Sequence, residues 1–452
     1  MLTIRIRKKR FILGSDQFVL ILTAILLCMS VWEGVLGALQ LFGIKESNNI
    51  FFNITGSFYN PGPFGCFIAM TFPLFIYISY RSGNRWILLI ARLVVLLDVL
   101  VISASLSRTA WLACIMGSVV AFNDKVKPFL KRIDAVILII FISMVCLLGA
   151  FVLKEDSAKG RILMWKVAVL AINSNPFEGV GWKNVGGAYG DAQEDYFSTE
   201  CRSEEERQIA DAPRYVFNEY LQIAIAFGWG WMLIMIFIFV MAITSSIKAR
   251  RFEICGCMAA VMVVMFASYP FQFQISVITM AMICVIALLS NDYWINKYIV
   301  IPTVIVGSIV IIFMKSTDSI EWSFYNGQVL HRTQKYNESN DVLKLLIEES
   351  SDPMILNLIG KNYNYIGKLD SAEYYLIRST KRCPNRLYPH YLLMKLYEDT
   401  LYFNKDRLVR EAEFIIMHKE KIHSPAIDDM KKEAYNILYQ IGVKNSIINL
   451  SK

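Results

Sequence analysis

Three arginines in this sequence have positions that favour binding of an anionic ligand. Arg108 lies in a short connection between two apolar runs, whereas Arg161 and Arg214 lie near the two ends of a long polar segment, residues 154–219. A guanidinium group donates a planar fork of hydrogen bonds that fits phosphate, and a basic group at the edge of a membrane is costly enough to need a reason. We therefore expect the arginines to hold a diphosphate, although Arg108 could also simply extend toward lipid headgroups.

Two further groups of residues would complete this anion site. Trp165 follows Arg161 by one helical turn, so both side chains share one helix face. Asn218, Glu219 and Tyr220 are expected to form the first turn of a helix, whose free N–H groups attract an anion. We therefore expect Trp165, Asn218 and Tyr220 to bind substrate together with the arginines.

The elements that position these residues are long apolar runs. The chain is 55% hydrophobic and 19% charged, whereas an ordinary soluble domain has about 25% charged residues. The sequence therefore predicts an all-α fold with a polytopic transmembrane helix bundle in residues 1–314. Taking ~20 residues for one bilayer crossing, we expect about nine spans. They are residues 18–42, 64–80, 86–105, 109–122, 133–153, 220–247, 254–270, 275–290 and 298–314.

Basic residues in the short loops orient the chain in the membrane. Lys and Arg concentrate in the N-terminus and in the loops at residues 81–85, 123–132 and 248–251, which alternate with loops that are poor in basic residues. We expect the basic set to be cytoplasmic, so the large loop 154–219 and the tail are external. The net charge of +8 reflects this orientation and does not indicate nucleic-acid binding.

The polar tail, residues 315–452, is expected to be a separate soluble α-helical domain. Residues 353–386 fit a helix-turn-helix repeat of about 34 residues and resemble a tetratricopeptide repeat. Because at least three such repeats usually stack, we expect about three helix pairs and a terminal helix at residues 425–439. The tail would either cap the membrane part as a scaffold or dock a protein partner or a glycan.

No metal ion or other cofactor is expected. The nine cysteines show no metal-ligand spacing, and most lie in apolar runs as small buried side chains. The acidic stretch at residues 191–206 also lacks ligand spacing, and we expect it to be a solvated, mobile surface.

Four patches of the sequence form a larger pattern. They are residues 56–61 (GSFYNP), 107–113 (SRTAWLA), 161–181 (an arginine and a tryptophan followed by NPFEGVG) and 218–221 (NEYL) with Gly228. In order, spacing and side of the membrane, this pattern resembles the O-antigen ligase/polymerase superfamily of bacterial envelope glycosyltransferases. The resemblance covers roughly residues 50–290, and a tail of tetratricopeptide type also occurs in that superfamily.

The resemblance implies an enzyme of the bacterial inner (cytoplasmic) membrane that works at the external face. It would move a glycan from a polyprenyl (undecaprenyl) diphosphate donor to an acceptor glycan or glycolipid, without a metal and with inversion. Carried over residue by residue, Arg108, Arg161 and Arg214 would hold the diphosphate. Fixed cations there would stabilise the charge that develops on the leaving diphosphate.

One departure from the superfamily bears on the chemistry. Its ligases carry a histidine just before the asparagine of the fourth patch, where this chain has Phe217, and all four histidines of this chain lie in the tail. Glu219 is then the best candidate to take the proton of the acceptor hydroxyl, with Glu178 and Asp211 as fallbacks. We therefore expect Glu219 and Arg161 to be the catalytic residues.

Three classes of function agree with the sequence. The leading hypothesis is a membrane glycosyltransferase, and the missing histidine favours a polysaccharide polymerase or a protein glycosyltransferase over ligation onto a lipid A core. A transporter or flippase of lipid-linked glycans would show internal repeats, discontinuous helices and midplane charges. The third class is a non-catalytic protein of envelope-glycan assembly.

Overall fold

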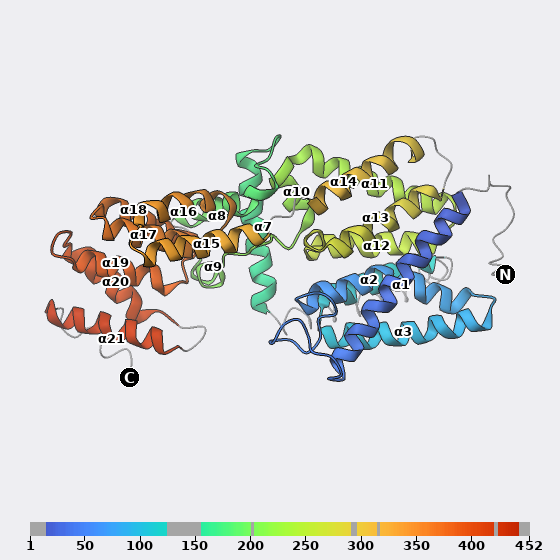
Figure 1. Ribbon diagram of the computed structural model, residues 1–452, viewed down its shortest axis with the longest axis horizontal. Coiled ribbons are helices and arrows are strands. Elements are labelled where there is room, and N and C mark those ends of the chain that lie inside the picture. Colours follow the sequence, from blue (N-terminus) through green and yellow to red (C-terminus); the bar gives the residue numbers. More distant parts are fainter. Residues whose placement is uncertain are drawn as a thin grey trace. The chain divides into compact units, whose positions relative to one another are not determined.

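The chain folds into two compact units that are both helical. The computed structural model describes residues 15–123, 155–199, 203–290, 296–313, 317–419 and 424–442 (Figure 1). The apolar unit consists of residues 1–155 and 215–315, and the polar unit consists of residues 156–214 and 316–452. Every regular element among the described residues is a helix, which confirms the all-α prediction for that part of the chain.

The apolar unit contains eleven helical elements among the described residues, most of them within the predicted hydrophobic runs. They are α1 (Ser15–Leu41), α2 (Pro61–Arg81), α3 (Arg85–Ser105), α4 (Arg108–Ala121), α10 (Glu219–Phe227), α11 (Trp229–Lys248), α12 (Phe252–Ala267), η2 (Pro270–Gln272), α13 (Gln274–Leu289), η3 (Asn296–Val300) and α14 (Ile301–Phe313).

Four of the described helices are long and apolar enough to cross a membrane, namely α1, α2, α3 and α11. Four shorter apolar helices accompany them, at Arg108–Ala121, Phe252–Ala267, Gln274–Leu289 and Asn296–Ile312. The predicted span at 133–153 lies outside the described residues. A multi-pass membrane protein is therefore supported, whereas the number of nine spans stays a prediction.

The predicted single span at residues 220–247 is wrong, because the chain breaks at Gly228. Helix α10 ends at Phe227, and α11 begins at Trp229. Gly228 has φ +86°, a conformation that is open to glycine and strained for other residues. The backbone therefore turns between two apolar helices that hydropathy alone reads as one.

Small residues let three helices of the apolar unit pack closely. A Cβ atom on Gly117 of α4 would lie 2.5 Å from Pro73 Cγ of α2 and 2.8 Å from the carbonyl oxygen of Gly256 in α12. Close backbone approach of this kind is how helices associate in lipid, where no hydrophobic driving force acts between them. These contacts hold α4, the helix that begins at Arg108, close to α2 and α12.

The polar unit combines two parts of the chain that are far apart in the sequence. The large loop contributes α7 (Glu155–Ser174), η1 (Trp182–Asn184), α8 (Val185–Ser198) and α9 (Glu204–Ile209). The tail contributes α15 (Thr317–Arg332), α16 (Tyr336–Glu349), α17 (Pro353–Tyr365), α18 (Leu369–Arg382), α19 (Leu387–Glu398), α20 (Lys405–Met417) and α21 (Pro425–Gln440).

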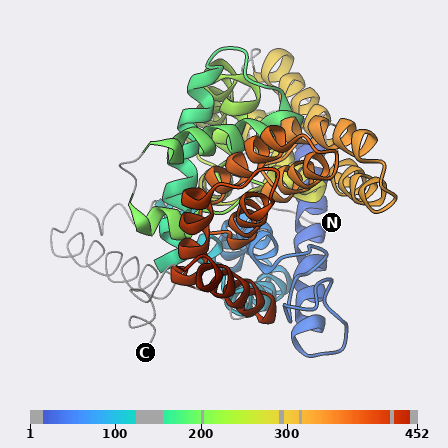
Figure 2. The same ribbon diagram turned by 90° about the vertical axis from the view of Figure 1, so that its left-hand side faces the viewer.

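The tail helices pack as successive pairs, α15 with α16, α17 with α18, and α19 with α20, followed by α21 (Figure 2). Gly360 allows the close contact within the second pair, because a Cβ atom there would lie 2.8 Å from the Leu376 side chain. The expected helix pairs and terminal helix are thus present among the described residues. Their assignment to the tetratricopeptide family stays a prediction.

One end of the acidic stretch contacts the tail, which corrects the expectation of a solvated, mobile surface for Glu194, whereas Asp191 is 58% exposed. Helix α8 contacts α16 and α18 (Figure 1). Arg382 of α18 has no exposed side-chain surface, and its guanidinium lies 2.6 Å from Asp191 and 2.7 Å from Glu194. Arg378 contacts the same two carboxylates at 3.0 and 2.7 Å. Two arginines thus neutralise acidic residues that would otherwise repel each other.

Glycines permit this close packing. Gly186 and Gly187 lie directly against the backbone at the end of α16, where a Cβ atom would overlap the carbonyl groups of Glu348 and Glu349. Gly190 lies against the Arg382 guanidinium, because a Cβ atom at Gly190 would lie only 2.8 Å from Arg382 Cζ. The loop therefore docks on the tail through fitted surfaces as well as through charge.

Candidate functional site

Helix α4 begins at Arg108 and is held by the residue before it. The Ser107 side chain accepts a hydrogen bond from the Ala110 N–H at 3.3 Å, which caps the helix. Leu106 has φ +50°, a conformation that is unusual for a leucine and that ends α3. A strained residue and a cap therefore place Arg108 at a fixed point, the first residue of α4.

Helix α10 begins in the same way. The Asn218 side chain accepts hydrogen bonds from the Tyr220 N–H at 3.0 Å and the Leu221 N–H at 3.2 Å. Phe217, one residue earlier, has φ +55°. Strained backbone of this kind concentrates at functional sites. The left-handed conformation is also one that histidine adopts more readily than phenylalanine.

Glu219 is the first residue of α10 and lies outside the four helices long enough to span a membrane. Its side chain is fully buried, and Oε1 accepts a hydrogen bond from the Phe271 N–H at 2.7 Å. Oε2 has no hydrogen-bond partner among the described residues. Burial raises the pKa of Glu219 to about 8, and the hydrogen bond from Phe271 opposes this rise only in part.

A carboxyl group with this pKa can exchange a proton near neutral pH. Environment-shifted carboxyls act as general acids and bases in several enzyme classes. The unpartnered Oε2 is the atom through which Glu219 would exchange that proton. Tyr220 does not share this chemistry, because its hydroxyl donates to the Met262 carbonyl oxygen at 3.4 Å.

An aromatic cluster lies beside these residues. Tyr269 stacks on Tyr215, with ring centroids 4.9 Å apart, and Phe217 packs edge-on against it at 4.7 Å. Phe273 lies 5.8 Å from Tyr269 and 4.9 Å from Phe58. The cluster thus joins the loop before α2, the segment before α10 and the connection between α12 and α13.

The starts of α4 and α10 both contact that connection. Thr109 of α4 donates from its hydroxyl to the Ala267 carbonyl oxygen at 3.2 Å, and the N–H of Phe271 donates to Glu219. The sequence did not reveal this connection, because its first residues were counted in the predicted span at residues 254–270 and it carries no charge. The proline of the Tyr269-Pro270 pair was the available signal, since proline interrupts an apolar helix.

The loop before α2, which carries the first patch, is held by buried polar side chains of α1. Glu33 Oε2 accepts a hydrogen bond from the Ser57 N–H at 2.9 Å. Gln40 Oε1 accepts from the N–H groups of Thr55 and Gly56 at 2.9 and 2.7 Å. Gly56 has φ +58°, a backbone conformation that favours glycine over other residues.

The other predicted site residues belong to the polar unit. Arg161 and Trp165 lie one turn apart on α7, and both are partly buried. Arg214 forms an ion pair of 2.9 Å with Glu321, and 45% of its side chain is exposed. An exposed pair of this kind contributes at most about 1 kcal/mol.

The alternative bases differ in their surroundings. Glu178 is exposed, and Asp211 lies 2.9 Å from Arg386. Among the described residues, no group of three His, Cys, Asp or Glu side chains could hold a metal ion. The predicted site residues thus divide between the units. Arg108, Asn218, Glu219 and Tyr220 belong to the apolar unit, whereas Arg161, Trp165 and Arg214 belong to the polar unit.

Comparison with known proteins adds a family match over part of the chain. Residues 93–236 match the family model described as O-Antigen ligase. A search of curated proteins finds no significant match, and neither does a search of solved structures. The matched residues contain every residue that we predicted for the site. The match supports the resemblance to the ligase/polymerase superfamily and, with the apolar helices, indicates membrane-based glycan processing of the O-antigen ligase/polymerase type.

Proposed function

We propose that this protein is a metal-independent, inverting glycosyltransferase that uses a polyprenyl-diphosphate-linked glycan as donor. The acceptor is a second glycan or glycolipid at the external face of the bacterial inner membrane. The observation that carries the proposal is the family match over residues 93–236, because it contains both the candidate base and the arginines.

In this proposal a hydroxyl oxygen of the acceptor attacks the anomeric carbon of the donor glycan. The bond from that carbon to the diphosphate oxygen breaks, and the diphosphate leaves with the electron pair. Deprotonated Glu219 takes the proton of the hydroxyl through Oε2. Arg108, Arg161 and Arg214 stabilise the leaving diphosphate, with Asn218 holding the first turn of α10 in place and Trp165 and Tyr220 lining the substrate site.

Deletion of the gene distinguishes the forms of this activity. If the protein is a polymerase, the ladder of surface-glycan lengths disappears and single units remain attached. If it is a ligase, lipid-linked chains accumulate without attachment. An unchanged glycan pattern would contradict both forms.

Single variants then test the site. We expect Arg161→Ala and Glu219→Gln to fail to restore the glycans while still reaching the membrane. Lys166→Gln is the matched control, because Lys166 is an exposed cation on the same helix as Arg161 and pairs with Glu206 at 2.7 Å. Full activity of Glu219→Gln would contradict the assignment of the base.

One observation favours transport of lipid-linked glycans as a second candidate. The break between α10 and α11 at Gly228 makes a discontinuous helix pair, which is a feature of transporter binding sites. Proteoliposomes that contain the purified protein and a fluorescent lipid-linked glycan separate the two functions. Movement of the glycan between leaflets without a new glycosidic bond would support transport and contradict the transferase.

A further inference from the structure

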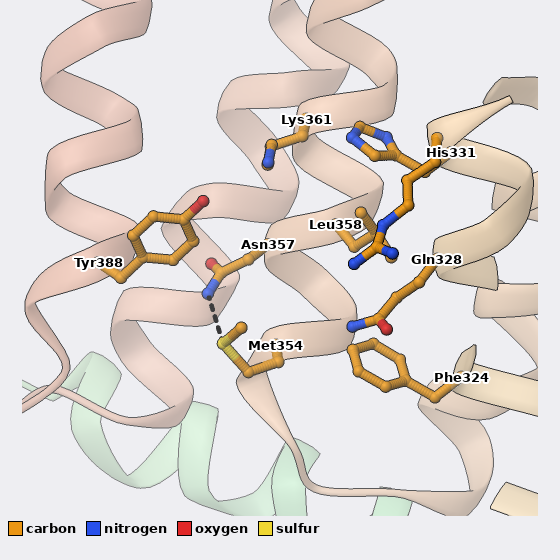
Figure 3. A pocket seen from close by; sticks show the side chains of 9 residues that line it. Phe324, Gln328, His331, Met354, Asn357, Leu358, Lys361 and Tyr388 are labelled. Carbon is orange, nitrogen blue, oxygen red and sulfur yellow. Dashed lines mark hydrogen bonds between the residues drawn. The ribbon is translucent and has the colours of Figure 1, made fainter. Parts of the chain in front are cut away.

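A cavity in the tail has the chemistry of a binding site. It encloses about 170 Å³ between the first helices of the three pairs, α15, α17 and α19 (Figure 3). Sites for drug-sized ligands enclose about 300–1,000 Å³, so this cavity has room for a single ring. Phe324, Met354 and Leu358 supply its apolar surface.

The polar groups of the cavity converge without binding one another. Asn357 is 2% exposed, and its Oδ1 has no hydrogen-bond partner among the described residues. Within the described part of the chain, the Asn357 amide nitrogen has one hydrogen-bond contact, to the Met354 sulfur at 3.8 Å. Figure 3 shows Asn357 between Tyr388 on one side and Gln328 on the other. A buried amide that lacks a partner is unfavourable, so a ligand that donates a hydrogen bond to it would be stabilised.

The cavity also carries positive charge. Arg332 and Lys361 line it, and neither forms an ion pair with another described residue. Two cationic side chains that line one cavity favour a carboxylate, and the Arg332 fork can bind both carboxylate oxygens. Aromatic rings at Phe324 and Tyr388 offer flat apolar surfaces to the C–H faces of a ring.

We propose that this cavity binds one acidic sugar residue, a hexuronate, of a glycan chain. This inference rests on the proposed function, in which the protein handles glycans. A bare carboxylate only accepts hydrogen bonds and would leave Asn357 Oδ1 unsatisfied, whereas a sugar hydroxyl both donates and accepts. The carboxylate would bind Arg332 and Lys361, the hydroxyls would bind Asn357 and Gln328, and the ring would pack on the aromatic side chains.

Calorimetric titration of the full-length protein in detergent micelles tests the proposal. The probes are a tetrasaccharide of alternating glucuronate and N-acetylglucosamine and its carboxyl-reduced form. We expect the acidic form to bind at least about tenfold more tightly, because each charge-assisted hydrogen bond contributes about that factor. Arg332→Gln and Lys361→Gln should each weaken binding of the acidic form about tenfold and lower the preference for it by the same factor.

Asn357→Leu separates the contribution of the amide to binding from the contribution of the two cations. It should weaken binding of both probes, because both carry hydroxyls. Lys381→Gln is the control, since Lys381 is an exposed cation of α18 that does not line the cavity. Circular dichroism and an unchanged elution volume establish that each variant is folded.

Three outcomes would overturn the proposal. The first is that the acidic tetrasaccharide does not bind, and the second is that the wild type and the cavity variants bind it equally. The third is that the cavity binds a peptide instead of a sugar. The last would appear as binding of an acetylated penta-alanine that the same variants abolish while the tetrasaccharide fails to bind. Transfer activity without tetrasaccharide binding would contradict this inference alone, and binding without transfer would contradict the proposed function alone.

Discussion

Replacing Arg382 by methionine would weaken the docking of the loop on the tail. Arg382 is fully buried and contacts Glu194, whose side chain is 12% exposed, and Asp191, which is 58% exposed. Removing one partner of a buried ion pair costs about 3–5 kcal/mol, because the other charge stays buried. Since Arg378 still contacts Glu194 and Asp191 is solvated, we expect the lower end, about 3 kcal/mol.

Hydrogen exchange measures this local loss directly. In the full-length protein, amides of α8 exchange when the loop opens from the tail, so a loss of about 3 kcal/mol raises their exchange rate about a hundredfold. Amides of α12, in the apolar unit, should keep their wild-type rates. Mass spectrometry of proteolytic peptides from the two helices gives both values in one experiment.

Arg386→Gln is the matched control for Arg382→Met. Arg386 forms an ion pair of 2.9 Å with Asp211, but both side chains are more than half exposed. Exposed pairs contribute about 0–1 kcal/mol, so exchange in α8 should change less than about fivefold. Equal effects of the two substitutions, or no effect of Arg382→Met, would refute the docking of the acidic loop through buried charge.

Three further predictions follow from the apolar unit. Glu219 has a raised pKa of about 8 and acts as a base only when it is deprotonated. The rate of glycan transfer at limiting substrate should therefore rise with pH and level off above about pH 8. A rate that stays constant between pH 6 and about 9 would contradict this prediction. Asn218→Ala removes the cap of α10, and we expect a loss of about 1 kcal/mol in unfolding, whereas Asn218→Ser should restore most of it. Gly256→Leu would force α4 and α12 apart, since even a Cβ atom at residue 256 would lie 2.9 Å from Ala121 Cβ. Detergent-solubilised protein with this substitution should lose its sharp melting transition.

Burial of Glu219 also makes stability depend on pH. Its carboxyl binds a proton more tightly in the folded protein than in the unfolded chain, because burial raises the pKa. The stabilisation is therefore complete below the unfolded pKa of about 4.3 and is lost as the pH rises through about 8. Glu219→Gln should remove this dependence, which thermal melting at several pH values would detect.

Local patterns in the sequence predicted much of the fold. The apolar runs at 64–80 and 86–105 coincide with α2 and α3, and the terminal helix expected at 425–439 is α21. These elements depend on hydrophobic period and on nearby caps, which a sequence carries locally.

Long-range partners could not be predicted in this way. Nothing near Glu194 in the sequence reveals that its partner is Arg382, 188 residues later. The acidic stretch was therefore predicted to be a solvated surface. The break at Gly228 was missed because the residues on both sides are apolar, and hydropathy does not register a left-handed glycine. Tyr269 was missed because it was counted in the predicted span at residues 254–270, where an aromatic residue is ordinary until its ring neighbours are known.

Reaction of the purified protein with a defined undecaprenyl-diphosphate-linked glycan and a labelled acceptor tests the central claim most directly. The account predicts a new glycosidic bond with inverted anomeric configuration and one free undecaprenyl diphosphate for each bond formed. It also predicts that Arg161→Ala and Glu219→Gln abolish both products while Lys166→Gln retains them. Absence of transfer by folded wild-type protein, or full transfer by Glu219→Gln and Arg161→Ala, would contradict it.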